Sequence, residues 1–442
     1  MSIKSTNDWC QSGSFALSIF HCPWKGTKML KKLASKIKVA ALSIPLMLGL
    51  SAGASSNNSP DTTYWLKIKA SNKFERTAIE NMGIPIDIVR EDYVISYGSQ
   101  SDVEQLKNKK LLIAQSPVVN ATDFPAQDGI YHNYEEVTAA LQQLASENPD
   151  IISLNSIGKS NEGRDLWHLT ISTDLATSRQ KPAVIFMGGH HAREHLSIDI
   201  PLRLTQKFIQ DYRAGDPRIV RLMKSREIHM IPMVNPDGAE YDIASGTYKM
   251  WRKNRRLNSD GSYGVDLNRN YGFQWGTGGS SNNPKADTFM GPTPFSEPES
   301  QAIKTFVEQQ DNATLLLTFH TFSELILYPW GHKYDPITDA KDASVFKTMA
   351  QKMSTWNNYT PQQASELYIA SGDTTDWAYG TQHIFAFTFE LDPKFTGGGW
   401  GFYPGADVIP EVLRKNWEPF LYMMEYADNP YRTLDNVSGL NF

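Results

Sequence analysis

Residues 189–195 read GHHAREH, and this stretch decides the fold and chemistry expected of the chain. It follows a short apolar run at residues 183–187 and precedes a segment with helical periodicity, so it marks the junction of a strand and a helix. His191 and Glu194 form a His-x-x-Glu pair at this junction. One neutral histidine and one glutamate aimed at the same point are a common part of a catalytic zinc site. The stretch therefore predicts a third metal ligand elsewhere in the chain.

Two more apolar runs of buried-strand type end in residues that fit such a site. Residues 314–319 lead into His320, which completes a set of three protein ligands. Three ligands leave a fourth position open, and this distinguishes catalytic from structural zinc sites. Residues 384–389 lead into Glu390, whose charge would otherwise be costly on a buried strand. We therefore expect Glu390 to act as the general base.

The bulk properties describe an ordinary soluble globular protein. The chain has 442 residues, of which 40% are hydrophobic, and this exceeds what one domain commonly uses. The formal net charge of -5 and the isoelectric point near 6.1 leave no global basic surface, so nucleic acid is not an expected partner.

Residues 29–54 have the features of a secretory signal peptide. A basic start is followed by an apolar run at residues 39–50 and by a Ser-Ala-Gly-Ala cleavage site. The apolar run is shorter than the roughly 20 residues of a membrane span, so we expect a secreted protein with no membrane attachment after cleavage. Residues 1–28 then form an upstream extension, which holds both cysteines, Cys10 and Cys22. The exported part is expected to use neither disulfides nor thiol chemistry.

Residues 55–122 predict a small α/β unit with its linker. The pattern predicts strands at 64–70, within 86–97 and at 111–114, and helices at 74–82 and 101–110. Such an alternation is typical of a split βαβ unit. We interpret it as a pro-segment, and an independent binding module is the alternative.

Residues 123–442 predict one large α/β domain. A helix at 134–145, a strand at 167–172 and an amphipathic stretch at 410–427 belong to an alternating pattern that favours a mixed, mostly parallel sheet covered on both faces. In such sheets, ligands bind outside the carboxyl ends of the strands. Pro201 predicts that the helix after Glu194 kinks or begins late. Residues 296–299, SEPE, predict a helix start with a capping box.

Several separated motifs resemble one family. They are HAREH at 191–195, NPDG at 235–238, WRKNRR at 251–256, VDLNRNYG at 265–272, HTFSELILYPWG at 320–331, LYIASGDTTDW at 367–377 and FTFEL at 387–391. In this order they resemble the zinc metallocarboxypeptidases, most closely the bacterial carboxypeptidase T type, from about residue 123 to residue 431. The resemblance implies an α/β fold with a mixed, mostly parallel eight-stranded sheet and helices on both faces, preceded by a small α/β pro-segment.

The resemblance also implies roles for the residues of the catalytic centre. His191, Glu194 and His320 hold one zinc ion, and Glu390 takes a proton from the attacking water. Arg252 stabilises the oxyanion that develops on the peptide carbonyl. The neighbouring arginines 255 and 256 are expected to be solvated or structural.

A further set of residues is implied to bind the substrate, which is the C-terminus of a peptide or protein. Asn268 and Arg269 grip its terminal carboxylate, and Tyr368 closes over it. Asp266 orients the first zinc histidine. Arg193 is similar to an arginine that lines a subsite.

Asp373 and Thr375 match the two positions that distinguish the side-chain pockets of family members. Their combination predicts release of both apolar and basic C-terminal residues. Asp373 can alternatively be read as a turn carboxylate after Gly372.

The resemblance has consequences for activation and for a second metal. It implies a pro-segment that covers the cleft until an activating protease cuts near Asp123. Residues 177–181 read TSRQK where the carboxypeptidase T type has an acidic calcium-binding loop. That calcium site is therefore predicted to be absent, and calcium dependence stays open.

Two rival readings of the same residues remain. His191, Glu194 and His195 also fit the inverzincin pattern, in which both histidines bind zinc and the glutamate is the base of an endopeptidase. The His320 and Glu390 motifs favour the carboxypeptidase reading. The other rival is a catalytically silent binding module with this fold, which would lack the base, the carboxylate-binding arginine or a ligand. The sequence lacks none of these.

Overall fold

The computed structural model describes residues 64–86, 88–117, 130–244, 248–394 and 401–435. The upstream extension, the signal peptide and the cleavage site near Asp123 lie outside the described residues. In the described part of the chain, no helix is long and apolar enough to span a membrane.

The N-terminal part of the described chain is a small α/β unit. Its elements are β1 (Tyr64–Lys69), α1 (Lys73–Glu80), β2 (Ile88–Val89), β3 (Tyr93–Gly98), α2 (Gln100–Asn108) and β4 (Leu112–Pro117). The strands form an antiparallel sheet in the order β2-β3-β1-β4. This is the predicted split βαβ arrangement. A hydrophobic cluster that includes Leu66, Ile68 and Leu106 fills its interior.

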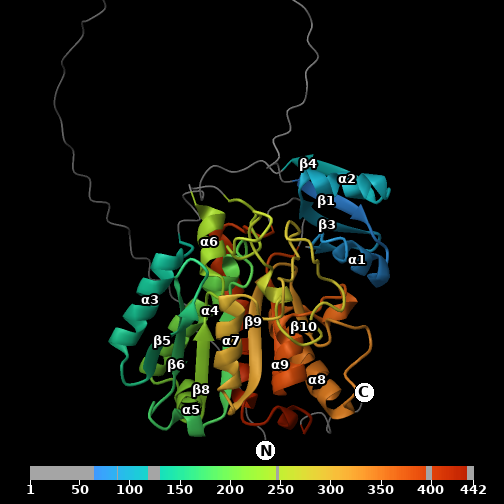
Figure 1. The fold of residues 1–442 in the computed structure, drawn as a ribbon. Helices are drawn as coiled ribbons and strands as arrows, with labels where there is room; N and C mark the ends of the chain where they lie inside the picture. Colours follow the sequence, from blue (N-terminus) through green and yellow to red (C-terminus); the bar gives the residue numbers. More distant parts are fainter. Residues whose placement is uncertain (1–63, 87, 118–129, 245–247, 395–400, 436–442) are drawn as a thin grey trace, which may run out of the picture. The chain divides into compact units, whose positions relative to one another are not determined.

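The larger part is built on an eight-stranded mixed sheet within the described residues (Figure 1). Its strands are β5 (Ile152–Lys159), β6 (Asp165–Ile171), β7 (Ala183–Gly188), β8 (Glu227–Ile231), β9 (Ala313–Thr321), β10 (Leu325–Tyr328), β11 (Thr360–Gln363) and β12 (Phe385–Leu391). Their order is β11-β10-β12-β9-β7-β8-β6-β5. The central strands β12, β9, β7 and β8 run parallel to one another. The α/β fold with a mostly parallel sheet is thus confirmed.

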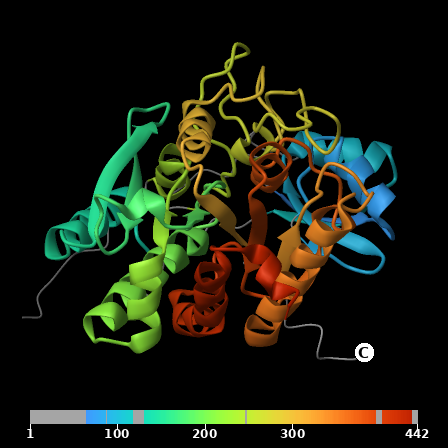
Figure 2. The same ribbon diagram turned by 90° about the horizontal axis from the view of Figure 1, so that it is seen from below.

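Helices cover both faces of this sheet, as predicted. They are α3 (Tyr134–Glu147), α4 (Leu196–Arg213), α5 (Pro217–Ser225), α6 (Pro236–Ile243), α7 (Pro298–Glu308), α8 (Ala340–Asn357), α9 (Thr374–Gln382) and α10 (Ile409–Tyr426). Figure 2 shows α4, α10 and α8 on one side of the sheet, and α7 and α9 on the other.

Strand β9 shows why the central strands read as continuous apolar runs. Successive side chains of a strand point to opposite faces. Leu315 and Leu317 accordingly belong to the core on the side of α4, α8 and α10, and Leu316 belongs to the core on the side of α7 and α9. Because both faces are covered, the strand is mostly apolar, and Thr314 and Thr318 are its only polar residues before His320.

The register of the parallel strands brings polar residues together at that end. In the pairing of β12 with β9, Glu390 lies directly beside His320. Strand β7 ends beside β9, and Gly189 follows it with φ +68°, a conformation that glycine adopts readily. This turn leads the chain into His191 and then into α4.

Helix α4 starts at Leu196, so the prediction of a late start was wrong. Pro201 lies inside the helix and has no N–H for the carbonyl of Ser197. That carbonyl instead faces Gly188, where an added Cβ would lie 2.0 Å from its oxygen. Glycine in the preceding strand therefore makes room for the helix to run through the proline.

The predicted capping box at the start of α7 was also wrong. The N-cap residue is Glu297, and its side chain makes no capping hydrogen bond. Glu297 instead accepts hydrogen bonds from Asn254 Nδ2 at 2.8 Å and from Arg256 Nη1 at 2.7 Å. A tertiary ion pair therefore outweighs the local capping preference, and Arg256 is structural as expected.

Candidate active site

A buried His–Glu–His cluster lies at the carboxyl end of the sheet. One potential ligand atom from each of His191, Glu194 and His320 lies within 4.8 Å of the others. The two Nδ1 atoms of the histidines are 3.2 Å apart. The carboxylate of Glu194 approaches His191 Nδ1 to 2.8 Å and His320 Nδ1 to 3.0 Å. Three donor atoms thus converge although their residues lie on β9 and on the turn before α4.

These donors suit a zinc ion. In a tetrahedral site with Zn–N bonds of about 2.05 Å, two ligand nitrogens lie about 3.3 Å apart. The observed nitrogen separation is 3.2 Å. The charge balance also fits, because the field of the two histidines outweighs burial and lowers the pKa of Glu194. Two imidazoles and an ionised carboxylate are the donor set of a catalytic zinc site.

Asp266 connects the cluster to two neighbouring groups. Its Oδ1 lies 3.2 Å from His191 Nε2, and its Oδ2 accepts a hydrogen bond from Arg252 Nε at 3.0 Å. Burial opposes the charge of Asp266, but Arg252 and His191 outweigh it and hold the pKa of this carboxyl well below its usual range. Burial likewise opposes the charge of Arg252, while Asp266 and Glu194 keep the pKa of the guanidinium above its ordinary value. Both groups stay charged at all ordinary pH values.

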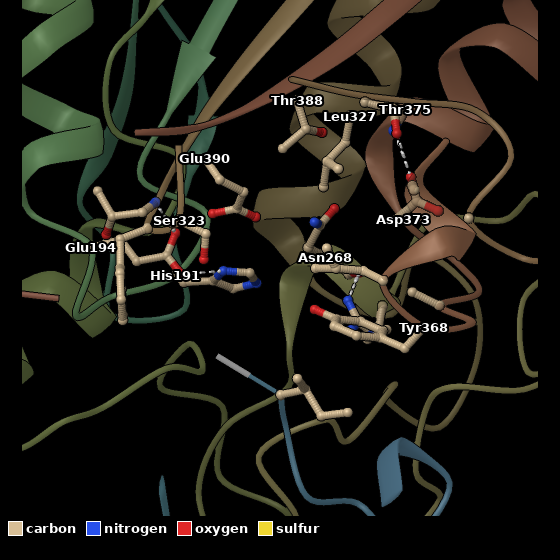
Figure 3. A pocket seen from close by; sticks show the side chains of 18 of the residues that line it. His191, Glu194, Asn268, Ser323, Leu327, Tyr368, Asp373, Thr375, Thr388 and Glu390 are labelled. Atoms are coloured by element: carbon tan, nitrogen blue, oxygen red, sulfur yellow. Dashed lines mark hydrogen bonds and ion pairs between the residues drawn. The ribbon is translucent and has the colours of Figure 1, made fainter. Parts of the chain in front are cut away.

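A cleft opens beside the cluster. Among the predicted site residues it is lined by His191, Glu194, Arg252, Asn268, Arg269, Tyr368, Asp373, Thr375 and Glu390. Figure 3 shows the Glu390 carboxylate in the cleft near His191 and Glu194, with Asp373 and Thr375 farther across it. His320 and Asp266 lie buried behind this lining.

Arg269 presents only part of its guanidinium to the cleft. Its Nε donates to Gly279 O and its Nη1 donates to Asn268 O, both at 2.9 Å. Its Nη2 makes no hydrogen bond within the described residues. The backbone of Arg269 is held by η3 (Leu267–Arg269), which follows Asp266 as its N-cap. This end of the guanidinium is therefore a fixed cationic donor, and the carboxylate of Glu80 faces it at 3.6 Å.

The two carboxylate oxygens of Asp373 have different surroundings. Asp373 is the N-cap of α9, and its Oδ1 accepts hydrogen bonds from Thr375 N, Thr375 Oγ1 and Asp376 N at 2.7–2.9 Å. Its Oδ2 is buried and has no hydrogen-bond partner within the described residues. Burial, and then the charge of Asp376, raises the pKa of Asp373 to about 7. Oδ1 therefore serves as the turn carboxylate, and Oδ2 is the oxygen to which the predicted pocket role refers.

The small N-terminal unit contacts the rim of the cleft. Arg76 of α1 donates hydrogen bonds to Leu367 O at 2.6 Å and to Glu366 O at 2.8 Å, next to Tyr368. Tyr368 itself packs against the hydrophobic cluster of the small unit. Glu80 Oε2 lies 3.6 Å from Arg269 Nη2, and both side chains are buried. Burial raises the pKa of Glu80 to about 7, although Arg269 opposes this shift.

A second contact of the small unit involves Arg193. The guanidinium of Arg193 lies over the ring of Phe402 at 4.2 Å and near the ring of Tyr97 at 5.9 Å. Tyr97 and Ile95 of β3 belong to the same apolar cluster as Phe322 and Phe402. Arg193 therefore lies beside the small unit and is not among the residues that line the cleft.

His195 is not part of the metal cluster. Its Nε2 lies 3.0 Å from Asp242 Oδ2, and the hydroxyl of Tyr403 donates to the same oxygen at 2.7 Å. The ligand set of the inverzincin reading, His191 with His195, is therefore not the one that converges.

Sequence reasoning missed several residues of the site. Leu327 of β10, Thr388 of β12 and Ile86 of the small unit also line the cleft. These residues carry no chemical signature, because an apolar residue or a threonine on a strand reads as core.

A mixed α/β sheet that carries a buried His–Glu–His cluster at its carboxyl edge defines a metal-dependent hydrolase. Residues 137–419 match the family model described as zinc carboxypeptidase. A zinc carboxypeptidase from Saccharothrix mutabilis subsp. capreolus is 36% identical over 415 residues, which cover 88% of this chain and 94% of that protein. Carboxypeptidase A2 from Mus musculus is 31% identical over 369 residues, which cover 82% and 84% of the two chains.

A solved structure agrees with these sequence matches. The carboxypeptidase A from Helicoverpa armigera superposes with a TM-score of 0.70 at 26% identity, covering 84% of this chain and 98% of that one. The chain belongs to the zinc carboxypeptidase family. It is a zinc metallocarboxypeptidase, a hydrolase whose family acts on the C-termini of peptides.

Proposed function

We propose that this carboxypeptidase is secreted with an N-terminal pro-segment and releases both apolar and basic residues from peptide C-termini. One observation supports the catalytic assignment above all others. A single cleft is lined by metal-cluster residues, by the carboxylate of Glu390, and by the cationic and amide groups of Arg269 and Asn268. These groups lie far apart along the chain, so chance does not explain why they meet in one cleft.

In this proposal His191, Glu194 and His320 are the zinc ligands. When bound, zinc lowers the pKa of water to about 7 and polarises a carbonyl oxygen. Glu390 takes the proton from the attacking water and passes it to the leaving amine. Arg252 faces the oxyanion of the peptide carbonyl, and such a fixed cation is typically worth about 3 kcal/mol in the transition state.

Asn268 and Arg269 hold the terminal carboxylate of the substrate, and Tyr368 closes over it. Support comes from Arg269, which lines the cleft and whose Nη2 makes no hydrogen bond within the described residues. An arginine fork suits this task because it offers parallel N–H donors to a carboxylate. Only a chain end carries such a carboxylate, so the grip accounts for exopeptidase action. Arg193 is assigned to a more distant subsite.

The small unit is proposed to be the pro-segment. The Glu80 carboxylate lies 3.6 Å from the Arg269 cation that would otherwise receive a substrate carboxylate. Because Glu80 and a substrate cannot both approach Arg269, the small unit blocks the grip until a protease removes it. Secretion follows the signal-peptide pattern of residues 29–54.

The decisive experiment measures release of C-terminal residues from a panel of peptides. The zinc-loaded protein is assayed before and after limited proteolysis between residues 117 and 131. We expect little release before cleavage and strong release of Leu, Phe, Lys and Arg afterwards. Peptides with an amidated C-terminus should be poor substrates, since they lack the carboxylate. Cleavage of internal bonds, or no release from any peptide after trimming, would contradict the proposal.

The preference for basic residues should depend on pH through Asp373. Its pKa is raised to about 7, so the carboxyl is neutral well below pH 7 and charged well above it. Only the charged form attracts a cationic side chain. The ratio of kcat/KM for a C-terminal Lys peptide to that for a Leu peptide should therefore rise from pH 6 to pH 8. Asp373→Asn should abolish this rise and lower kcat/KM for Lys by about 10- to 100-fold. An unchanged Lys-to-Leu ratio in this variant would refute the role of Asp373.

A further inference from the structure

Behind the cleft, a group of buried hydroxyls surrounds His190, which the chemistry above does not use. The His190 side chain is fully buried. Its Nε2 lies 3.1 Å from Thr374 Oγ1 and 3.0 Å from the hydroxyl of Tyr271. Its Nδ1 lies 3.3 Å from Thr318 Oγ1. His190 thus joins the turn after β7 to β9 and to the first turn of α9.

Thr374 links His190 to Asn268. Both the backbone N–H and the hydroxyl of Thr374 donate to Asn268 Oδ1, each at 2.9 Å. An amide oxygen has two lone pairs, so these two donors satisfy it. The Nδ2 donor group of Asn268 is consequently turned away from Thr374, and Figure 3 shows the amide in the cleft. In this orientation Asn268 offers hydrogen-bond donors, which suits an anionic ligand.

The direction of the hydrogen bonds follows from the number of protons available. Thr374 uses its only hydroxyl proton on Asn268, so its oxygen can only accept from His190. With Nε2 protonated, His190 donates to this oxygen, the Tyr271 hydroxyl lies 3.0 Å from the same nitrogen, and Nδ1 accepts from the hydroxyl of Thr318. The result is a chain of donors that runs from Thr318 through His190 and Thr374 to Asn268.

We propose that His190 is a positioning residue for substrate binding, because its bond to Thr374 fixes the Asn268 amide that receives the terminal carboxylate. This inference rests on the proposed grip of Asn268 and Arg269. His190 has one other notable contact, since its ring stacks on that of His320 with centroids 5.5 Å apart and an angle of 18°. A test must therefore separate an effect on the grip from an effect on the metal cluster.

His190→Phe makes this separation, because phenylalanine keeps a ring beside His320 and makes none of the three hydrogen bonds of His190. In the zinc-loaded, trimmed protein we expect KM for a peptide substrate to rise about 5- to 20-fold while kcat stays within about threefold. The inhibition constant of free leucine, which has a carboxylate, should rise by a similar factor. That of acetohydroxamic acid, which binds metal and has no carboxylate, should not change. Loss of zinc, or a fall in kcat at constant KM, would overturn the proposal.

The partner residue gives a second test. Thr374→Val removes the hydroxyl and should reproduce the rise in KM, whereas Thr374→Ser should recover most of the lost affinity. In the double variant His190→Phe/Thr374→Val, KM should be no higher than in the worse single variant, because both changes break one chain. If the rise in KM of the double variant equals the product of the two single rises, the residues act independently, and the proposal is overturned.

Two controls distinguish this inference from the proposed function. His229→Phe makes the same change at a buried histidine of β8, which pairs with His168 of β6. This variant should leave KM unchanged. Asn268→Ala should raise KM at least as much as His190→Phe. If Asn268→Ala has no effect on KM, the proposed grip is wrong. If it raises KM and His190→Phe does not, the grip stands and only the role of His190 is wrong.

Discussion

Glu390→Gln is expected to lower kcat by about 10²- to 10⁴-fold, the usual contribution of a general base. Glutamine keeps the size of the side chain and its place beside His320 on the neighbouring strand, but it cannot take up a proton. KM should change little, because Glu390 is not part of the proposed carboxylate grip. The measurement is kcat at saturating peptide, together with the zinc content of the purified variant.

A matched control makes the same chemical change elsewhere. Glu411 lies exposed on α10 and pairs with Arg414, so Glu411→Gln should keep wild-type kcat. Zinc content should equal that of the wild type in both variants, because neither residue belongs to the metal cluster. A Glu390→Gln variant that retains more than about a tenth of wild-type kcat would show that another group is the base.

His320→Ala is expected to abolish zinc binding and to lower activity by at least about 10³-fold. The substitution removes one of three protein donors, and the remaining His191 and Glu194 cannot hold the ion in a tetrahedral site. Zinc stabilises a native state that binds it, by about 4 kcal/mol at a thousandfold excess over Kd. Added zinc should therefore raise Tm of the wild type and leave Tm of the variant unchanged.

His195→Gln is the control that decides between the two ligand sets. His195 bonds to Asp242 and lies outside the cluster, so this variant should still bind zinc. Loss of zinc in His195→Gln with retention in His320→Ala would instead favour the inverzincin reading. Metal content by atomic emission and the zinc-dependent shift in Tm both report the difference.

Much of the fold was predictable because its strands are covered on both faces. Runs such as residues 314–319 are mostly apolar, with threonines at 314 and 318, and this pattern marks both the strand and its central position. A charged or polar residue at the end of such a run is then conspicuous. The features that failed were local, as at Pro201 and Glu297. At Pro201 the packing of α4 on Gly188 overrides the local preference, and at Glu297 contacts with Asn254 and Arg256 do so.

The pocket was less predictable than the metal cluster. The small unit contributes Ile86 to the cleft and places Glu80 near Arg269. The sequence pattern of residues 64–117 does not indicate this contact, because the contact depends on how two hydrophobic cores meet. Likewise, nothing in the sequence indicates that one carboxylate oxygen of Asp373 caps α9 while the other has no hydrogen-bond partner within the described residues.

The sequence by itself determined the class of fold, the family and the residue types that could serve the metal. It could do so because burial and strand ends leave a pattern in neighbouring residues. Only the tertiary structure decided that His320 and not His195 joins His191, and that Thr374 turns the amide of Asn268. Strand order and register determine which side chains meet, and they arise from contacts between residues far apart in the chain.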